Sequence, residues 1–412
     1  MEERYHQDRR FWVSPYNFVP EVRDAMTLPS RVCIHDATLR DGEQTPGVVF
    51  RKEDKVDIAV MLDEVGVERI EAGMPAVSDE DFDAMSTIGK LGLKAKIFSF
   101  VRAMKVDIDK SVDCGAHGVI LEIPIGYPKL QYQFGWTWQE VLTRSVETIR
   151  YAKDKGMYVV YFPYDTTRAR PSDLESLLTS LMREAPPDAV GVVDTMGCAL
   201  PEAIKYLVKQ VKSLTGLPVE IHTHNDFGMA VAAELAAVSA GAEVVHSCAN
   251  GLGERTGNAA LEELILGLEL LLGIGGPYRM DKLMELSSLV SERSNVRLAD
   301  NKPVVGESNY TRESGIGVDL VMKQPLAMFA TDPHMTGRKG KVVLGKKSGK
   351  ASILYILESM GIRGVEDEQV TRLLHAVKER GIHKRGLVSP DEFGEILRNV
   401  AGIIPPEQAT SA

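Results

Sequence analysis

The chain contains 412 residues, of which 44% are hydrophobic and 26% are charged, and its formal net charge is −10. This length and composition are ordinary for a globular protein with one large domain and a smaller one. The acidic balance argues against nucleic acid or an anionic membrane as the main partner, and no apolar run approaches the roughly 20 residues that a membrane span needs.

The N-terminal extension, residues 1–29, is charged and lacks the apolar core of a signal peptide. The cysteines lie far apart without a CxxC pair, which indicates neither a disulfide framework nor a thiolate zinc site. They are Cys33, Cys114, Cys198 and Cys248. We therefore expect a cytoplasmic protein in a reducing compartment.

From residue 30 onward, short apolar runs alternate with segments of helical period such as "KEDKVDIAVMLDEVG" and "PEAIKYLVKQVKSLTG". Strands that alternate with helices predict a parallel sheet, and eight such units over residues 30–285 favour a closed (β/α)₈ TIM barrel. The predicted strands are Val32–Ala37, Glu68–Glu71, Lys96–Phe100, Gly118–Pro124, Tyr158–Tyr164, Ala189–Asp194, Val219–His222 and Val244–Ala249. An open doubly wound sheet is the alternative, but "GLGERTGN" follows the last strand, whereas a dinucleotide fingerprint would follow the first.

The alternation of apolar runs with helical segments ends near residue 285. The stretch from Asp300 to about Lys350 is rich in Gly, Lys and Asp, and amphipathic helices are predicted within 350–361 and 366–381, with another from Pro390. The fold class is therefore α/β, with a TIM barrel followed by a smaller helical, loop-rich C-terminal subdomain over residues 286–412.

Polar residues follow several of the predicted strands at their C-terminal ends, which is where TIM barrels carry their reactive groups. The first predicted strand ends in the motif "HDATLRDGEQ", and single polar residues or short polar motifs lie at the ends of the others. The candidates are Asp36, Arg40, Asp41, Gln44, Glu71, Tyr164, Thr195, His222, His224, Gly253, Glu254, Arg255 and Asn258. His35 alternates with Asp36 along its strand, so we expect its side chain to face away from the barrel lumen.

The motif "EIHTHNDFGMA" places His222 and His224 two residues apart at a strand end, so both imidazoles point to one face. With Asp41 they form a three-point N/O ligand set that suits Mn²⁺, Mg²⁺, Zn²⁺ or Fe²⁺; a pair of structural histidines is the alternative. Arg40 would supply a fixed positive charge for a developing oxyanion; its alternative is a salt bridge with Asp36 or Glu71. The glycine-rich loop can hold a phosphorylated cofactor, although by itself it is a weak signal.

The motifs "DATLRDGEQ", "HTHNDFGMAVA" and "NGLGERTGNAALEEL" resemble the DRE-TIM metallolyase superfamily and, in the last motif, its Claisen-condensing branch of 2-isopropylmalate, homocitrate and citramalate synthases. The resemblance implies that one divalent metal binds Asp41, His222, His224 and Asn258, and that a 2-oxo acid condenses with acetyl-CoA before the thioester is hydrolysed. It implies an alkoxide-stabilising role for Arg40, substrate contacts from Thr195 and Gln44, and an acyl-CoA loop at Gly253, Glu254 and Arg255.

The chain departs from that pattern at several positions. Tyr164 stands where the family usually has Glu, Gly317 where it has His, and Met328 where it has Tyr. We therefore expect a proton-transfer step, assisted by the metal and Arg40, in which Tyr164 is the proton donor or acceptor and Glu71 is the alternative. The aromatic loop "IPIGYPKLQYQFGW" either lines the substrate pocket or forms a patch beneath the C-terminal subdomain, and if it lines the pocket the acceptor is not simply 2-oxoisovalerate.

Three functions are consistent with these residues. The first is a metal-dependent condensation of an acyl-CoA with a 2-oxo acid, and the second is a lyase of the same superfamily that cleaves a C–C bond of a related hydroxy acid or hydroxyacyl-CoA. The third is a non-catalytic barrel that binds a metal or a metabolite. The resemblance also implies a homodimer without a leucine-type regulatory domain.

Overall fold

A computed structural model describes residues 4–404. It divides into two compact units, which we describe separately. The larger unit consists mainly of Ser14–Leu298, and the smaller unit combines His6–Val13 with the chain from Ala299 onward.

The larger unit is a closed barrel of eight parallel strands, in the order β10-β3-β4-β5-β6-β7-β8-β9. The predicted TIM barrel is therefore confirmed, and the open-sheet alternative is wrong. All eight predicted strands are present, with ends that differ by a few residues. They are β3 (Cys33–Asp36), β4 (Arg69–Glu71), β5 (Lys96–Arg102), β6 (Gly118–Pro124), β7 (Tyr158–Tyr164), β8 (Ala189–Asp194), β9 (Val219–Thr223) and β10 (Val244–Ser247).

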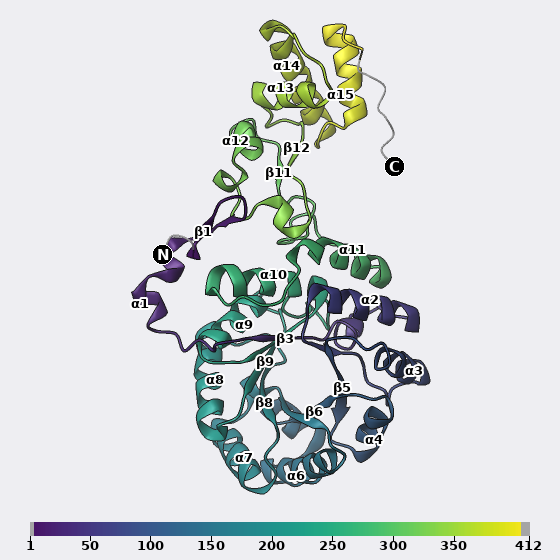
Figure 1. The fold of residues 1–412 in the computed structure, drawn as a ribbon, viewed down its shortest axis with the longest axis vertical. Coiled ribbons are helices and arrows are strands. Elements are labelled where there is room, and N and C mark those ends of the chain that lie inside the picture. Colours follow the sequence, from purple (N-terminus) through teal and green to yellow (C-terminus); the bar gives the residue numbers. More distant parts are fainter. Residues whose placement is uncertain (1–3, 405–412) are drawn as a thin grey trace. The chain divides into compact units, whose positions relative to one another are not determined.

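Helices surround the strands (Figure 1) and bury one apolar face each. In α7, for example, Leu174, Leu177, Leu178 and Leu181 recur at helical spacing and are buried. The main helices are α2 (Lys52–Val65), α3 (Asp79–Ile88), α4 (Lys105–Asp113), α6 (Trp138–Asp154), α7 (Pro171–Glu184), α8 (Pro201–Thr215), α9 (Ala230–Ser239), α10 (Leu261–Leu266) and α11 (Leu283–Ser294). Within residues 4–404, no helix is both long and apolar enough to cross a membrane.

The barrel lumen has an aromatic and apolar middle, which includes Phe98, Phe100, Ile120, Val160, Phe162, Ala189 and Val193. His35 belongs to this lumen: its ring lies 5.3 Å from that of Phe98 and stacks on His246 at 4.3 Å. Asp36 is turned the other way, where it accepts hydrogen bonds from the Thr38 amide and the Ser247 hydroxyl. Our expectation for this strand was therefore wrong, because alternation fixes which residues share a face but not which face is inside.

The smaller unit begins with the hairpin of β1 (His6–Gln7) and β2 (Phe11–Trp12), whose Trp12 amide donates to the Ala330 carbonyl at 2.8 Å. A short parallel pair, β11 (Thr311–Arg312) and β12 (Lys341–Val342), is followed by helices that pack around Ile353, Leu373, Val377 and Phe393. These helices are α13 (Lys350–Ser359), α14 (Asp367–Lys384) and α15 (Pro390–Ile396), close to the predicted ranges.

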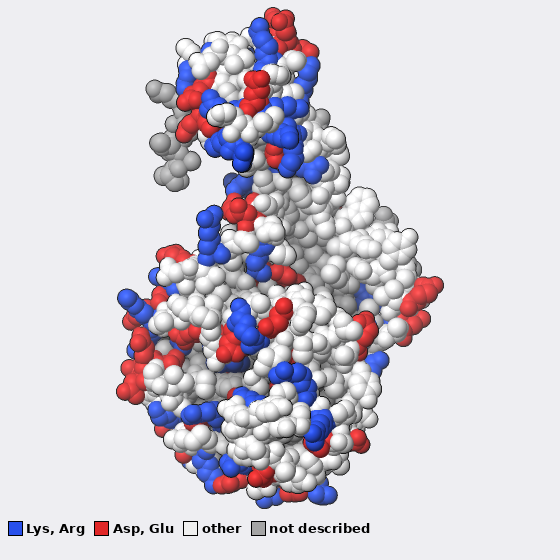
Figure 2. Space-filling view, turned by 180° about the vertical axis from the view of Figure 1, so that it is seen from behind, with Lys and Arg blue, Asp and Glu red and all other residues white. Residues whose placement is uncertain are grey.

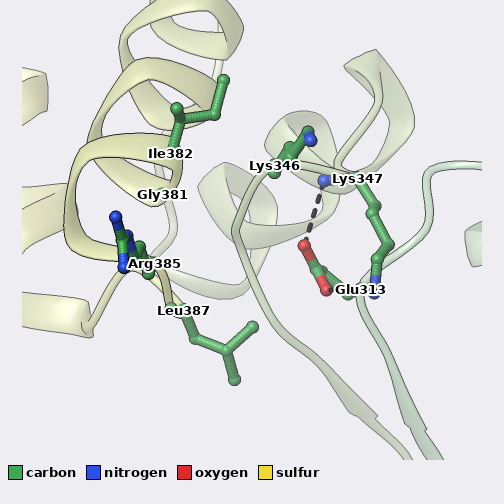
Figure 3. A pocket seen from close by; sticks show the side chains of 8 residues that line it. Glu313, Lys346, Lys347, Gly381, Ile382, Arg385 and Leu387 are labelled. Atoms are coloured by element: carbon green, nitrogen blue, oxygen red, sulfur yellow. Dashed lines mark hydrogen bonds and ion pairs between the residues drawn. The ribbon is translucent and has the colours of Figure 1, made fainter.

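A pocket of about 370 Å³ in the smaller unit lies between the C-terminal end of α14 and the loop around Lys346 (Figure 3). Lys346, Lys347 and Arg385 line it together with Glu313, which accepts a hydrogen bond from the Lys347 amide at 3.0 Å. None of the predicted site residues lies in this pocket. Elsewhere Lys and Arg side chains are interspersed with Asp and Glu on the visible face of the barrel (Figure 2), in agreement with the absence of a basic stripe in the sequence.

Candidate active site

Asp41, His222 and His224 converge at the C-terminal end of the barrel strands. One ligand atom from each residue lies within 4.8 Å of the other two, and all three side chains are buried. Asp41 Oδ2 is 3.2 Å from His222 Nε2 and 3.6 Å from His224 Nε2. β9 ends at Thr223, so two strand-spaced side chains on one face produce this convergence as the motif predicts.

The chemistry of this cluster fits a divalent cation. Both oxygens of Asp41 are buried without a hydrogen-bond partner, which is costly for a carboxylate unless a cation binds there. Burial by itself raises the pKa of Asp41, but Arg40 and the two imidazoles outweigh it and hold that pKa well below its usual range. Burial lowers the pKa of His222 and brings that of His224 to about 4, so both imidazoles are neutral ligands near pH 7.

Asn258 is brought next to this cluster by the loop after β10. Its backbone pairs with that of His224 in an isolated antiparallel β-bridge, and its Nδ2 donates a hydrogen bond to the Leu252 carbonyl at 3.0 Å. Its Oδ1 is buried and accepts no hydrogen bond, so it is available as a further oxygen ligand. Gly257 makes the loop possible: it has a φ of +83°, and a side chain there would collide with the Gly251 carbonyl.

Arg40 is buried between two carboxylates. Its Nε donates to Glu71 Oε1 at 2.5 Å, and its Nη1 lies 3.3 Å from Asp41 Oδ2. The salt bridge with Glu71, which the sequence left as an alternative, is therefore present, and it fixes the guanidinium beside the ligand cluster. The guanidinium also lies 4.2 Å from the ring centroid of Phe100, so it has a defined position on the lumen side.

The two proton acceptors that the sequence suggested have unfavourable surroundings. Burial, followed by the negative charges of Asp165 and Glu122, raises the pKa of Tyr164 to about 12. Burial alone would raise the pKa of Glu71, but Arg40 and His35 lower it to about 2. Near pH 7 the phenol is protonated, whereas the carboxylate is a weak base held by its partners.

Sequence reasoning missed Glu122, an acidic residue inside the apolar run "GVILEIP". It pairs in register with Phe162, whose ring is in the lumen 5.3 Å from His222. Lys129 Nζ lies 3.8 Å from Glu122 Oε1 and 3.5 Å from the ring centroid of Tyr164. A single charged residue in a strand that is otherwise apolar is the signal that could have identified it.

Thr195 and the glycine-rich loop form a second side of the mouth. The Thr195 hydroxyl accepts a hydrogen bond from the Asp165 amide at 2.9 Å, and the Thr195 carbonyl accepts one from Arg255 at 2.6 Å. Arg255 is also paired with Asp226 at 2.8 Å, while Glu254 is about half exposed. Gly253 donates its amide to the Thr45 hydroxyl at 2.8 Å, which ties this loop to the segment after β3.

Gln44 is exposed and lines a cavity of about 320 Å³ together with Arg40, Val48, Met74 and Val77. The cavity also contains Lys55, a buried lysine that the sequence analysis did not single out. Lys55 is held by Glu43 at 2.6 Å and by Asp81. The cavity thus has an apolar wall and a charged wall that includes Arg40.

The aromatic loop after β6 lines a different pocket, of about 500 Å³, with Tyr127, Trp136, Arg170 and Asp173 among its walls. Phe134 stacks on Trp136 with ring centroids 4.4 Å apart, and Tyr132 is 82% exposed. The described walls of this pocket include none of the predicted ligands. At the start of the same loop the Ile125 and Gly126 amides donate to the Tyr164 carbonyl, and the Lys129 ammonium lies 3.5 Å from the Tyr164 ring centroid.

His35, Glu220 and His246 form another group of potential metal ligands, in the lumen. The Nε2 atoms of the imidazoles and the oxygens of Glu220 already have partners: His246 Nε2 lies 3.0 Å from Glu220 Oε2, and Glu220 Oε1 accepts from Arg69 at 2.6 Å. His35 is 3.0 Å from Glu71. With the Arg69 cation in direct contact, this group is a polar part of the barrel core rather than a second metal centre.

In the smaller unit, two departures from the family pattern lie against each other. A side chain at Gly317, which has a φ of +84°, would approach the Met328 sulfur to 2.9 Å. The methionine therefore occupies the space next to the glycine. No imidazole is available at position 317.

The HMGL-like family model matches residues 31–290, and the model of the homocitrate synthase post-HMGL domain-like family matches residues 304–397. The chain belongs to the HMGL-like family. It is 42% identical over 384 residues to the homocitrate synthase AksA of Methanopyrus kandleri, covering 92% of this chain and 96% of that protein. These matches confirm the predicted membership of the DRE-TIM superfamily and its Claisen-condensing branch.

Two further relatives come from Methanocaldococcus jannaschii. Its 2-isopropylmalate synthase is 37% identical over 387 residues, covering 93% of this chain and 74% of that protein. Its (R)-citramalate synthase CimA is 39% identical over 377 residues, covering 92% and 76%. Among solved structures, an HMG-CoA lyase from Bacillus subtilis matches with a TM-score of 0.59 and 19% identity, covering 66% of this chain and 97% of the lyase, and supports the fold alone.

Proposed function

We propose that this protein is a divalent-metal-dependent acyltransferase that condenses acetyl-CoA, or a related acyl-CoA, with a 2-oxo acid to give a 2-hydroxy-dicarboxylic acid of the alkylmalate type. The observation that carries the proposal is the buried cluster of Asp41, His222 and His224 with Arg40 fixed beside it. Relatives that align over most of the chain are homocitrate, 2-isopropylmalate and citramalate synthases. The lyase alternative has support only from a likeness of fold.

Asp41, His222 and His224 would hold the metal, with Asn258 as a further oxygen donor. A bound Mn²⁺, Mg²⁺ or Zn²⁺ supplies Lewis-acid polarisation of the 2-oxo group. Residues 30–285 carry these groups, so we assign the chemistry to the barrel.

Arg40 stabilises the negative charge that develops on the 2-oxo oxygen during the reaction. When the carbon–carbon bond forms, the electron pair of the 2-oxo carbonyl moves onto its oxygen, and a buried guanidinium stabilises that charge more strongly than water does. Its pairing with Glu71 keeps the guanidinium in place before substrate binds, so little reorganisation is needed. Water then hydrolyses the thioester and releases the CoA thiol.

The remaining assignments concern binding. Thr195 and Gln44 contact the 2-oxo acid, and Gly253, Glu254 and Arg255 form the loop that receives the acyl-CoA. The hydroxyl of Thr195 can still donate, because in its bond with Asp165 it acts as the acceptor. We further propose that the enzyme is a homodimer, as its family resemblance implies, and that it works in the cytoplasm, which agrees with its widely spaced cysteines.

The test is release of free CoA. Purified protein is incubated with acetyl-CoA and Mn²⁺, Mg²⁺ or Zn²⁺, and with 2-oxo acids that differ in size and charge, while free thiol is measured. We expect thiol release that requires both a metal and an acceptor and that is abolished in Asp41→Asn. Glu175→Gln, an exposed glutamate of α7, serves as the matched control. The proposal fails if no acceptor stimulates thiol release with any of these metals.

A further inference from the structure

Glu122 lies on the wall of the barrel mouth between two aromatic strands. Its strand, β6, pairs with β5 and β7, which carry Phe100 and Phe162 in the lumen. Glu122 is two residues beyond Ile120, a lumen residue, and it is in register with Phe162. Both relations place its side chain on the lumen side, one step closer to the mouth than Ile120 on the same strand.

Within the described chain, the Glu122 carboxylate accepts no hydrogen bond, and its nearest cation is Lys129 at 3.8 Å. Its side chain is 17% exposed, so solvent reaches it only in part. Burial raises the pKa of Glu122, and the positive charges of Lys129, Arg40 and Arg102 offset this only partly. The carboxylate is therefore more basic than an ordinary glutamate and is not tied to a strong partner.

Four other acidic groups near the mouth are already engaged by partners. Glu71 is held by Arg40 at 2.5 Å. Both oxygens of Asp165 accept hydrogen bonds from Arg168: Oδ1 from Nε at 3.0 Å and Oδ2 from Nη2 at 2.8 Å. Asp194 accepts from the Thr167 hydroxyl at 2.7 Å and from the Ala199 amide at 3.1 Å. Asp226 is paired with Arg255 at 2.8 Å. A proton acceptor must have a free lone pair aimed at the substrate, and among these carboxylates Glu122 meets that need.

We propose that Glu122 is the catalytic base that removes the α-proton of the acyl-CoA, and that Lys129 positions it. This inference rests on the proposed condensing function. The α C–H bond breaks, its electron pair forms the carbon–carbon double bond of the enolate, and the thioester oxygen takes the negative charge. The proton goes to the Glu122 carboxylate, and the enolate carbon then bonds to the 2-oxo carbon while the carbonyl pair moves onto the oxygen that faces Arg40.

The experiment compares Glu122→Gln with the wild-type enzyme, with Glu175→Gln as the matched exposed control. We expect Glu122→Gln to lower kcat by about 10²–10⁴-fold, the usual range for an acid–base residue, with metal content and KM for acetyl-CoA unchanged. Exchange of solvent deuterium into the acetyl methyl group, followed by mass spectrometry with a 2-oxo acid present, should fall in parallel. Circular dichroism and thermal melting check that the variant is folded.

Lys129→Met adds a readout that a merely structural role would not give. The Lys129 charge favours the ionised carboxylate, so its removal raises the pKa of Glu122. The activity of a base grows as pH rises through that pKa, and the acidic limb of the kcat profile should therefore move up by about one pH unit. Glu122→Gln should lose this limb.

The outcomes separate the two proposals. A wild-type protein that releases no CoA with any acceptor refutes the condensing function and the assignment of Glu122 together. An active wild type with near-normal kcat and deuterium exchange in Glu122→Gln refutes the assignment of Glu122 alone. An unmoved acidic limb in an active, folded Lys129→Met refutes the role of Lys129.

Discussion

Replacing Glu71 by glutamine should lower the free energy of unfolding by about 3 kcal/mol at pH 7. The Glu71 side chain is fully buried, and Arg40 and His35 overcome the effect of its burial and lower its pKa from 4.5 to about 2. Each pKa unit corresponds to about 1.4 kcal/mol, so linkage gives about 3 kcal/mol. The value agrees with the roughly 3–5 kcal/mol lost when one partner of a buried ion pair is removed.

The pH dependence of this difference follows from its sign. A carboxyl whose pKa is lowered by folding contributes stability above its unfolded pKa of about 4.5, and this stability disappears as pH falls towards its folded pKa of about 2. Urea titrations followed by circular dichroism at pH 7, 5 and 3 should therefore show wild type and Glu71→Gln converging at low pH.

Glu220→Gln is the matched comparison, because Glu220 is also buried in the lumen and has its pKa lowered to about 2, by His246 and Arg69 against burial. We expect a similar loss of stability in both variants but a larger fall in kcat for Glu71→Gln, since Arg40 is freed only there. The reasoning would be refuted if Glu71→Gln unfolded within about 1 kcal/mol of wild type at pH 7, or if the difference persisted unchanged at pH 3.

His224→Ala should lose most of its bound metal by elemental analysis and titration calorimetry, because only Asp41 and His222 then remain of the three-residue cluster, with Asn258 as a neutral oxygen donor. Full metal content would contradict the ligand assignment. Tyr164→Phe should change kcat by less than about tenfold, because the Tyr164 phenol, with a pKa of about 12, is a poor base near neutrality. A loss of kcat of hundredfold or more with normal metal content would assign the role of proton acceptor to Tyr164. Light scattering at micromolar concentration should give twice the chain mass of 45.3 kDa, and a fully active monomer would exclude the homodimer.

The sequence predicts the barrel well, because eight apolar runs separated by helices leave little choice of topology, and the observed strands lie within a few residues of the predicted ones. It also predicts the convergence of His222 and His224, since strand spacing alone brings them to one face. The pairing of Arg40 with Glu71 could only be left as an alternative, because it depends on how β3 and β4 are placed side by side.

The side chains of β3 could not be assigned to the correct faces from the sequence. Strands of a parallel barrel are buried on both faces, so the pattern of apolar residues does not show which side chains face the lumen and which face the helices. His35 and Asp36 are both fully buried, one against lumen aromatics and the other behind the sheet. Glu122 could not be placed in the lumen for the same reason, because its neighbours Leu121 and Ile123 are apolar and as fully buried as a lumen residue.

The proposed role of Glu122 would let the barrel keep its reaction with Tyr164 on β7. Lumen-facing positions on neighbouring strands look into the same space, so a carboxylate absent from β7 can be supplied by β6 without a change of fold. Pro124 is in register with Tyr164, and Glu122 is two residues below it on the same strand. The Lys129 cation, 3.5 Å from the Tyr164 ring centroid and 3.8 Å from Glu122, then links the phenol to the carboxylate. With glycine at position 317, the proposed base on β6 would give the barrel its own proton acceptor.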